Sequence, residues 1–284
     1  MPELPEVELL VRHLASSLKR LTICDVKVKR AKSIRPTSVR HLRNMLIGTT
    51  FKTVIRRGKY LLFEMQPADR DSSFMLLGHL GMTGQMYLKP TCQKQRKHVA
   101  VVIDLGHQEF VFEDMRYFGR LTLDETPLKS LGPEPLNDCF NGETLRFSLR
   151  RSKQAIKVKL LDQSIVAGIG NIYASEALFR AGVSPKKAAR RLSGRQCSAL
   201  VVSIRNTLRE AIECGSSVSL DFAGSNQRDG FFYFGRAESV PKYFHECFLV
   251  YDRKNETCFN CETPIRHIVQ AARSTYFCPR CQRD

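Results

Sequence analysis

The sequence predicts an α+β protein with several domains: a leading helix with a β-rich domain, a helical domain, and a small zinc-bound element at the C-terminus. Apolar residues in the first eighteen positions repeat at helical spacing, and short β-rich runs follow them as far as residue 123. The apolar period becomes helical again after residue 141, and four cysteines lie within the last 27 residues. A chain of 284 residues can hold two domains with cores of their own and a smaller element.

The first element is a helix with one apolar face. Pro5 fits its first turn and Pro2 fits just before it, because proline is tolerated at the start of a helix and not deeper inside. The residues of the apolar face recur at helical spacing, and they are Val7, Leu10, Val11, Leu14 and Leu18.

Short strands follow the helix at close intervals, separated mostly by glycine and polar residues. Many short strands with frequent turns indicate a β-sandwich or a β-barrel. The predicted strands are Thr22–Val28, Phe51–Ile55, Tyr60–Met65, Phe74–Leu77, Gln85–Leu88, Val99–Asp104, Glu109–Phe112 and Leu121–Leu123.

A proline-rich segment, residues 125–141, separates this domain from the helical one and is predicted to be a linker. We therefore expect domains at 1–124 and 142–247, followed by the zinc element at 248–284.

The second domain is predicted to be helical, with helices Gly142–Arg150, Ser152–Asp162, Ile172–Ala181 and Ser193–Glu213. Ser193 and Gln196 have the spacing of a capping box. The stretch 215–245 has no clear period, and a stretch of this length without regular structure is often functional.

The four C-terminal cysteines form two C-x-x-C pairs separated by sixteen residues, Cys258/Cys261 and Cys278/Cys281. This spacing predicts a four-thiolate zinc site, with two disulfides as the alternative. Such a site has no open coordination position, so the metal is structural. Residues 265–277 between the pairs are predicted to form a β-hairpin that carries Arg266, His267 and Arg273. The six other cysteines lack paired spacing and are each expected to be a small buried hydrophobe in a reducing cell interior.

The charge of the chain indicates a polyanionic partner. Lys and Arg number 45 and Asp and Glu number 28, which gives a net charge of +17. Nucleic acid is the first candidate and an anionic membrane surface the second. No run of about 18 apolar residues is present that could span a membrane. The N-terminus also lacks a secretory signal pattern, so we expect a protein that works inside the cell.

The N-terminal residues offer a nucleophile. Removal of Met1 would leave Pro2 with a secondary amine that can attack a carbonyl or a sugar C1′ and form an iminium. The pKa of an α-amino group lies near 8, so an appreciable share is unprotonated at neutral pH. Glu3 stands beside it as an acid or base, and Glu6 follows one helical turn later. The alternative is a stiff chain end followed by acidic residues that complement the helix dipole.

Six motifs, taken together and in order, resemble those of the formamidopyrimidine-DNA glycosylase family, which also includes endonuclease VIII. The resemblance spans nearly the whole chain and implies a β-sandwich with a leading helix, a helix–two-turn–helix domain with a lesion-covering loop, and a zinc ribbon. The motifs are Pro2-Glu-Leu-Pro-Glu-Val, Arg57-Gly-Lys59-Tyr60, His79-Leu-Gly-Met82-Thr-Gly, Asp114-Met-Arg116-Tyr-Phe118-Gly, Gly168-Ile-Gly170-Asn171-Ile-Tyr173-Ala-Ser-Glu176 and the two cysteine pairs.

The resemblance implies a DNA repair enzyme that excises oxidised bases and cuts the strand by β,δ-elimination. Pro2 would attack C1′ of the damaged nucleotide, Glu3 would assist proton transfer, and Lys59 would contact a phosphate. Three further residues would fill the gap left by the flipped base. These gap-filling residues are Met82, Arg116 and Phe118.

The resemblance also implies phosphate contacts, a monomer and damaged double-stranded DNA as the partner. The phosphate-contacting positions would be Lys157, Gly170, Asn171 and Arg273.

Two departures from the family pattern stand out: the fourth motif has Met115 and Tyr117 where the family usually has Pro and Arg, and segment 215–253 looks longer than usual. Formamidopyrimidines are the expected substrates and 8-oxoguanine is a further candidate. An oxidised-pyrimidine enzyme resembling endonuclease VIII, and an inert zinc-ribbon DNA-binding protein, are the alternatives.

Overall fold

The computed structural model describes residues 2–69, 71–92, 97–216 and 248–283. It divides into two compact units. The first takes in the chain up to Lys129 together with Gly215 and Ser216, and the second takes in Ser130 to Cys214 together with the described residues from Phe248 onward. The two units are described separately below. Most of the stretch 215–245, including the predicted lesion-covering loop, lies outside the described residues.

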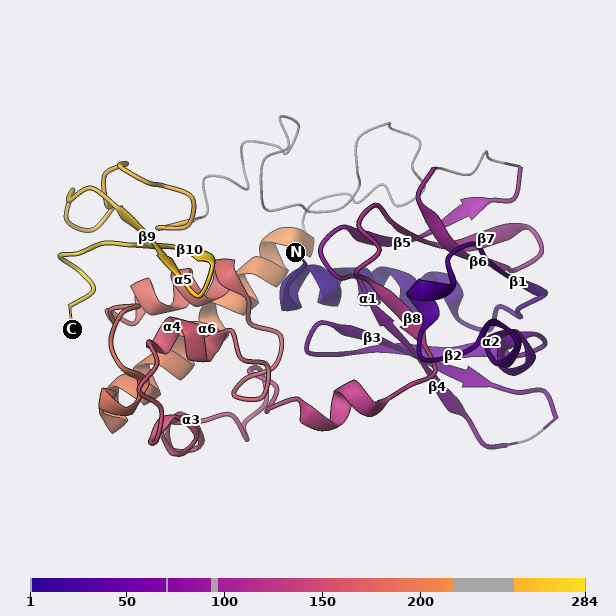
Figure 1. The fold of residues 1–284 in the computed structure, drawn as a ribbon, viewed down its shortest axis with the longest axis horizontal. Helices are drawn as coiled ribbons and strands as arrows, with labels where there is room; N and C mark the ends of the chain where they lie inside the picture. The colour runs from indigo at the N-terminus through magenta and orange to yellow at the C-terminus, as the bar shows by residue number, and fades with distance from the viewer. Residues whose placement is uncertain (1, 70, 93–96, 217–247, 284) are drawn as a thin grey trace. The chain divides into compact units, whose positions relative to one another are not determined.

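The first unit begins with helix α1, Leu4–Leu18, as the apolar period predicts (Figure 1). The backbone N–H of Glu3 donates to the carboxylate of Glu6 at 2.6 Å, which satisfies a donor at the start of the helix. The apolar face is buried and packs into the core of the unit, and α1 contacts strand β2. The N-terminal residues are thus held by a helix whose face is fixed in the core.

Two four-stranded antiparallel sheets form the β-sandwich, one in the order β1-β6-β7-β5 and the other β2-β3-β4-β8. The rings of Phe51, Phe63 and Phe110 meet in its core, with the centroids of Phe63 and Phe110 5.5 Å apart. The sandwich alternative is therefore confirmed. The strands are β1 Asp25–Val28, β2 Thr50–Arg57, β3 Tyr60–Gln66, β4 Phe74–His79, β5 Gly84–Pro90, β6 Val99–Asp104, β7 Gln108–Asp114 and β8 Arg120–Thr122.

Two short helices of this unit have no counterpart among the predicted elements: η1, Ala31–Ile34, and α2, Val39–Leu46. Helix α2 buries only Leu42 and Leu46, so its apolar period is too short to recognise in the sequence. Its start is capped by Ser38, whose side chain accepts the N–H of His41 at 3.2 Å.

The second unit is mainly helical. Its long helix α6 starts with the predicted capping box, in which Ser193 and Gln196 exchange two 3.2 Å hydrogen bonds. On α6, Arg205 donates to the carbonyls of Pro135, Asn137 and Phe140 and so holds the end of the proline-rich segment. The helical elements are η2 Thr126–Ser130, which begins in the first unit, α3 Gly142–Leu149, α4 Ile156–Leu160, α5 Asn171–Arg180, η3 Ala189–Arg191 and α6 Gly194–Ser216.

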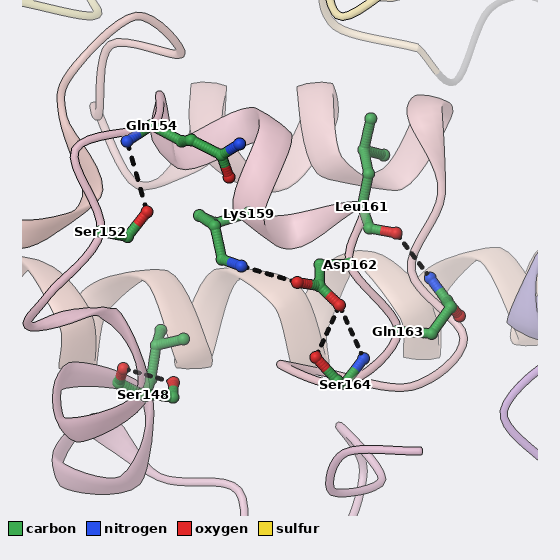
Figure 2. A network of polar contacts seen from close by, with 9 residues as sticks. Ser148, Ser152, Gln154, Lys159, Leu161, Asp162, Gln163 and Ser164 are labelled. Atoms are coloured by element: carbon green, nitrogen blue, oxygen red, sulfur yellow. Dashed lines mark hydrogen bonds and ion pairs between the residues drawn. The ribbon is translucent and has the colours of Figure 1, made fainter. Parts of the chain in front are cut away.

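Helix α4 is shorter than the predicted Ser152–Asp162. Before its start Ser152 Oγ accepts the N–H of Gln154 at 3.3 Å, and after its end Asp162 accepts the N–H and hydroxyl of Ser164 at 3.1 and 2.6 Å (Figure 2). Short polar side chains that bond nearby backbone groups compete with helical hydrogen bonds. These contacts explain why the helix is confined to five residues.

The C-terminal element contains the predicted hairpin, with β9 Arg266–Gln270 paired to β10 Arg273–Phe277. The turn residues Ala271 and Ala272 have φ of +46° and +58°, the conformation of a two-residue hairpin turn. Strand β10 lies against α5 (Figure 1). No helix among the described residues is long and apolar enough to cross a membrane.

Candidate active site, DNA contacts and zinc centre

The N-terminal residues predicted to carry the chemistry are buried at the start of α1. Pro2 is buried, and Glu3 and Glu6 are 3% and 5% exposed. A buried carboxylate is costly unless other groups stabilise it, and Glu6 receives the backbone N–H of Glu3. The structure therefore brings Pro2, Glu3 and Glu6 together in one short segment.

An ion-pair chain fixes this end of α1 to strand β2. The carboxylate of Glu8 accepts Arg56 Nε at 2.8 Å and Arg12 Nε at 2.9 Å. Burial raises the pKa of Glu8, but the hydrogen bonds from Arg56 and Arg12 outweigh it, and the pKa is lowered overall. Glu8 therefore stays ionised and ties the helix to the strand.

Lys59 lies in the tight connection between β2 and β3. Gly58 precedes it with φ of +56°, a conformation that glycine adopts readily. Lys59 is only 6% exposed, which is unusual for a lysine. Its burial supports a functional position, because an ordinary surface lysine would keep its ammonium group in water.

His79 belongs to the third motif but had no predicted role of its own. Its Nδ1 accepts the backbone N–H of Gly81 at 3.1 Å, and its ring centroid lies 4.7 Å from that of Tyr60. Burial, followed by the charges of Lys59 and Arg120, lowers the pKa of His79 to about 4. The imidazole is therefore neutral at pH 7 and holds the backbone just before Met82.

The three predicted gap-filling residues lie on two neighbouring loops that share one anchor. The buried carboxylate of Asp114 accepts the hydroxyl of Thr83 at 2.5 Å and the N–H groups of Arg116 and Gly119 at 3.1 and 2.7 Å. The hydroxyl of Thr83 also accepts the N–H of Arg116 at 3.2 Å. Asp114 thus joins the loop of Met82 to the loop of Arg116 and Phe118.

The side chains on these loops reach the surface. Phe118 is 50% exposed, Arg116 is exposed and Met82 is half-buried. The guanidinium carbon of Arg116 lies 5.0 Å from the ring centroid of Phe118. Gly81 lets the loops approach, because a Cβ on it would lie 2.6 Å from the backbone nitrogen of Gly119. Exposed apolar and cationic groups on braced loops suit insertion into a base stack.

In the second unit, Gly170 and Asn171 form the N-terminus of α5. Gln163 braces the preceding loop: its amide donates to the carbonyls of Leu161 and Ile169 at 3.0 and 2.8 Å, and its oxygen accepts the N–H of Gly168 at 2.9 Å. Figure 2 shows the contact with Leu161 next to the Asp162 network. Asn171 Oδ1 is buried and has no hydrogen-bond partner among the described residues. The N–H groups at a helix N-terminus are suited to a phosphate, and the amide Nδ2 of Asn171, not its Oδ1, is the side-chain atom that could donate to it.

Lys157 is buried, at 1% exposure, and supports the zinc element. Its ammonium group donates to the carbonyl of Ser274 at 2.7 Å and to the hydroxyl of Thr275 at 2.9 Å. Both acceptors are on β10, directly after Arg273. The phosphate contact predicted for Lys157 stays a prediction, while its contacts place it under the strand that carries Arg273.

Glu176 is a second support, and it stands in the fifth motif without a predicted role. Its buried carboxylate accepts the N–H groups of Leu249, Val250 and Tyr251 at 2.9, 3.0 and 2.8 Å. Burial raises the pKa of Glu176 more than these hydrogen bonds lower it. In the sequence, Glu176 stands among the apolar residues of α5, and this position could have indicated that its carboxylate is buried and hydrogen-bonded.

Arg273 is exposed at the first position of β10, beside the two-alanine turn. Non-glycine residues with positive φ cost energy and persist where the surrounding structure holds them. The hairpin is held by Lys157 and by the amide of Gln270, which donates to the carbonyl of Pro185 at 3.3 Å. The tip that presents Arg273 is therefore braced.

The four predicted zinc ligands converge, with their sulfur atoms within 4.8 Å of one another. The Cys261–Cys278 and Cys261–Cys281 sulfur pairs are 3.4 Å apart and the Cys258–Cys281 pair is 3.9 Å apart. Zn–S bonds of about 2.3 Å in a tetrahedron put sulfurs about 3.8 Å apart, so the cluster fits zinc. The predicted structural zinc is thus supported over two disulfides. The expectation that the other cysteines are buried is wrong for Cys24, Cys92 and Cys139, which are exposed.

Three family models match consecutive parts of the chain. The formamidopyrimidine-DNA glycosylase N-terminal domain matches residues 1–121, and the formamidopyrimidine-DNA glycosylase H2TH domain matches residues 131–222. The zinc finger found in FPG and IleRS matches residues 255–283.

Relatives and solved structures agree over the full length. The formamidopyrimidine-DNA glycosylase of Cupriavidus pinatubonensis is 41% identical over 296 residues, covering 99% of this chain and 100% of the relative. A Lactococcus lactis FPG variant in complex with Fapy-dG-containing DNA superposes with a TM-score of 0.85 at 31% identity, and both chains are covered completely. The wild-type Lactococcus lactis protein in complex with oxidised-pyrimidine-containing DNA gives a TM-score of 0.84 at 31% identity, again with complete coverage.

Proposed function

The chain belongs to the formamidopyrimidine-DNA glycosylase family, and from this we propose that it uses Pro2 to excise oxidised bases and to cut the strand at the resulting abasic site. It is a DNA repair glycosylase with a structural zinc. The observation that supports the catalytic assignment best is the buried N-terminal segment in which Pro2 adjoins Glu3 and Glu6.

The proposed reaction starts after Met1 is removed. The amine of Pro2 attacks C1′ of the damaged nucleotide, the glycosidic bond breaks, and the base leaves with a proton. Glu3 assists proton transfer at the sugar. The amine then loses its proton, the C1′–O4′ bond of the sugar breaks, and O4′ takes up a proton, which leaves an iminium between Pro2 and C1′. The iminium acidifies the C2′ proton; loss of this proton breaks the C3′–O bond, and a second elimination breaks the C5′–O bond.

The remaining residues hold the DNA in the proposed complex. Lys59 contacts a phosphate near the reacting sugar. In the second unit, Lys157, Gly170, Asn171 and Arg273 contact phosphates on the lesion strand. The position of Gly170 and Asn171 at the N-terminus of α5 and the braced position of Arg273 support these contacts. Base flipping costs a few kcal/mol, and Met82, Arg116 and Phe118 offset this cost by filling the gap.

We propose oxidised purines, with formamidopyrimidine foremost, as the preferred substrates. The Lactococcus lactis relative has been solved with both Fapy-dG and oxidised-pyrimidine DNA, so an activity on oxidised pyrimidines is the second candidate. We further propose that the protein works as a monomer on DNA inside the cell. The two candidates are distinguished by single-turnover excision of three lesions: formamidopyrimidine, 8-oxoguanine opposite cytosine, and thymine glycol. A clear preference for thymine glycol would make oxidised pyrimidines the preferred substrates.

Borohydride trapping tests the chemistry. Protein whose Met1 is confirmed absent should form a covalent adduct with damaged or abasic duplex DNA, and peptide mapping should place it on Pro2. A matched sample that retains Met1 should form none. If the processed protein gives no adduct, the protein is an inert DNA-binding protein. An adduct on Lys59 would show that Lys59, and not Pro2, is the nucleophile. Glu3→Gln should lose base excision more than abasic-site cleavage, because the latter omits the glycosidic step.

A further inference from the structure

Tyr117, between Arg116 and Phe118, has a left-handed backbone conformation with φ of +52°. A bulky non-glycine residue in this region is an outlier that persists where its surroundings hold it. The ends of the loop are fixed by Asp114, which binds the N–H groups of Arg116 and Gly119. The middle of the loop must be held by other contacts.

Tyr117 makes those contacts through its backbone and its ring. Its carbonyl accepts Arg120 Nη1 at 3.3 Å. The guanidinium carbon of Arg30 lies 5.0 Å from the ring centroid, within the range of a cation–π interaction. On the edge of the ring, the hydroxyl lies 3.5 Å from Nδ1 of His98.

The neighbours of Tyr117 make a different contact. Arg116 and Phe118 are exposed and lie against each other, with the guanidinium carbon 5.0 Å from the ring centroid. Arg30 follows β1, and its N–H donates to the carbonyl of Ala100 at 3.1 Å, so it is anchored to the sheet. The ring of Tyr117 therefore ties the exposed pair to a rigid part of the sandwich.

We propose that Tyr117 is a positioning residue: its ring, held by Arg30 and His98, sets the loop geometry that places Arg116 and Phe118 together for insertion into the DNA. This inference rests on the proposed function, because it assumes that the pair fills the gap of a flipped base. Without the ring, the loop loses its central anchor and the pair must be ordered during insertion.

Three variants separate the ring, the backbone and the cation. Tyr117→Phe keeps the ring and removes only the hydroxyl. Tyr117→Asn removes the ring, and asparagine tolerates the left-handed conformation better than most residues. Arg30→Gln removes the cation, and Arg40→Gln makes the same charge change at an exposed position of α2 as a matched control.

Each variant is tested by single-turnover excision, by cleavage of a preformed abasic site, and by a fluorescent cytosine analogue opposite the lesion that reports insertion. Tyr117→Asn and Arg30→Gln should slow excision and the fluorescence change by about tenfold. A rate effect of this size is expected when the cation–π contact that anchors the loop is lost. Abasic-site cleavage should change less. Arg40→Gln should stay near the wild type, and Tyr117→Phe, which loses only the hydroxyl contact with His98, should lose less than Tyr117→Asn.

The proposal is overturned if Tyr117→Asn excises the base as fast as the wild type. It is also overturned if Arg30→Gln loses equally in all three assays, because Arg30 would then be a simple DNA contact. Arg30→Gln and Tyr117→Phe still test the proposal if Tyr117→Asn does not fold. Failure of the proposed function can be told apart from failure of this inference. In the former case the wild-type protein itself neither excises the base nor is trapped by borohydride.

Discussion

The ammonium group of Lys157 on α4 lies 2.9 Å from the hydroxyl oxygen of Thr275 on β10. Thr275 is fully buried and follows two positions after Arg273. The lysine therefore links the helical part of the second unit to the hairpin whose tip presents Arg273. Any phosphate contact by Lys157 would add to this supporting role.

Lys157→Met should destabilise the second unit and weaken DNA binding. It keeps most of the side-chain volume but leaves the Ser274 carbonyl and Thr275 hydroxyl without their donor, at a cost of about 1–3 kcal/mol. Urea denaturation measures the stability. Lys159→Met is the control, because the ammonium group of Lys159 pairs with Asp162 at 2.6 Å and, among the described residues, makes no hydrogen bond to the hairpin. Unchanged stability with weakened binding would instead make Lys157 a phosphate contact alone.

Stability should fall in acid because of His79. Its folded-state pKa of about 4 lies below the ordinary value of 6.5, so the unfolded chain binds more protons between these values and the free energy of unfolding falls as pH falls. At about 1.36 kcal/mol per pH unit, the loss at pH 5 is about 2 kcal/mol. His79→Asn keeps an acceptor for Gly81 but does not titrate, so its stability should depend less on pH. Equal pH dependence in both proteins would contradict this prediction.

Loss of zinc should unfold the ribbon and weaken DNA binding. Cys258 and Cys278 also belong to the apolar cluster with Phe179, Val250 and Ile265, and structural zinc contributes directly to folding. Cys258→Ser should lower bound zinc and increase proteolysis after residue 248. Cys139→Ser, at an exposed cysteine outside the cluster, should behave like the wild type. Normal activity without zinc would refute the assignment.

Arg273→Ala and Met82→Ala should differ in their salt dependence. Each phosphate neutralised on duplex DNA adds about 0.9 to the log–log slope of affinity against salt. Arg273→Ala should weaken binding to every lesion and flatten the slope by about one unit. Met82→Ala removes no charge, so the slope should persist while excision slows. A loss of several kcal/mol of stability in Met82→Ala would show that Met82 is a packing residue.

The sequence by itself determined the main elements of both units. The apolar face of α1, the short strands, the capping box of α6 and the hairpin between the cysteine pairs all follow from local patterns, because periodicity and spacing are properties of neighbouring residues. The ordered motifs likewise identified the family and the zinc ligands before any distance was known.

Only the tertiary structure decided which residues support the site. Lys157 and Thr275 are 118 residues apart, and Glu176 binds backbone groups 73 or more residues away. Tyr117 meets Arg30 and His98 only after three separate segments come together. Helix α2 depends on the packing of Leu42 and Leu46, whereas α4 is confined by polar side chains bonded to groups two residues away, which is a local effect. Contacts between distant segments depend on how the chain folds, and no local pattern records them.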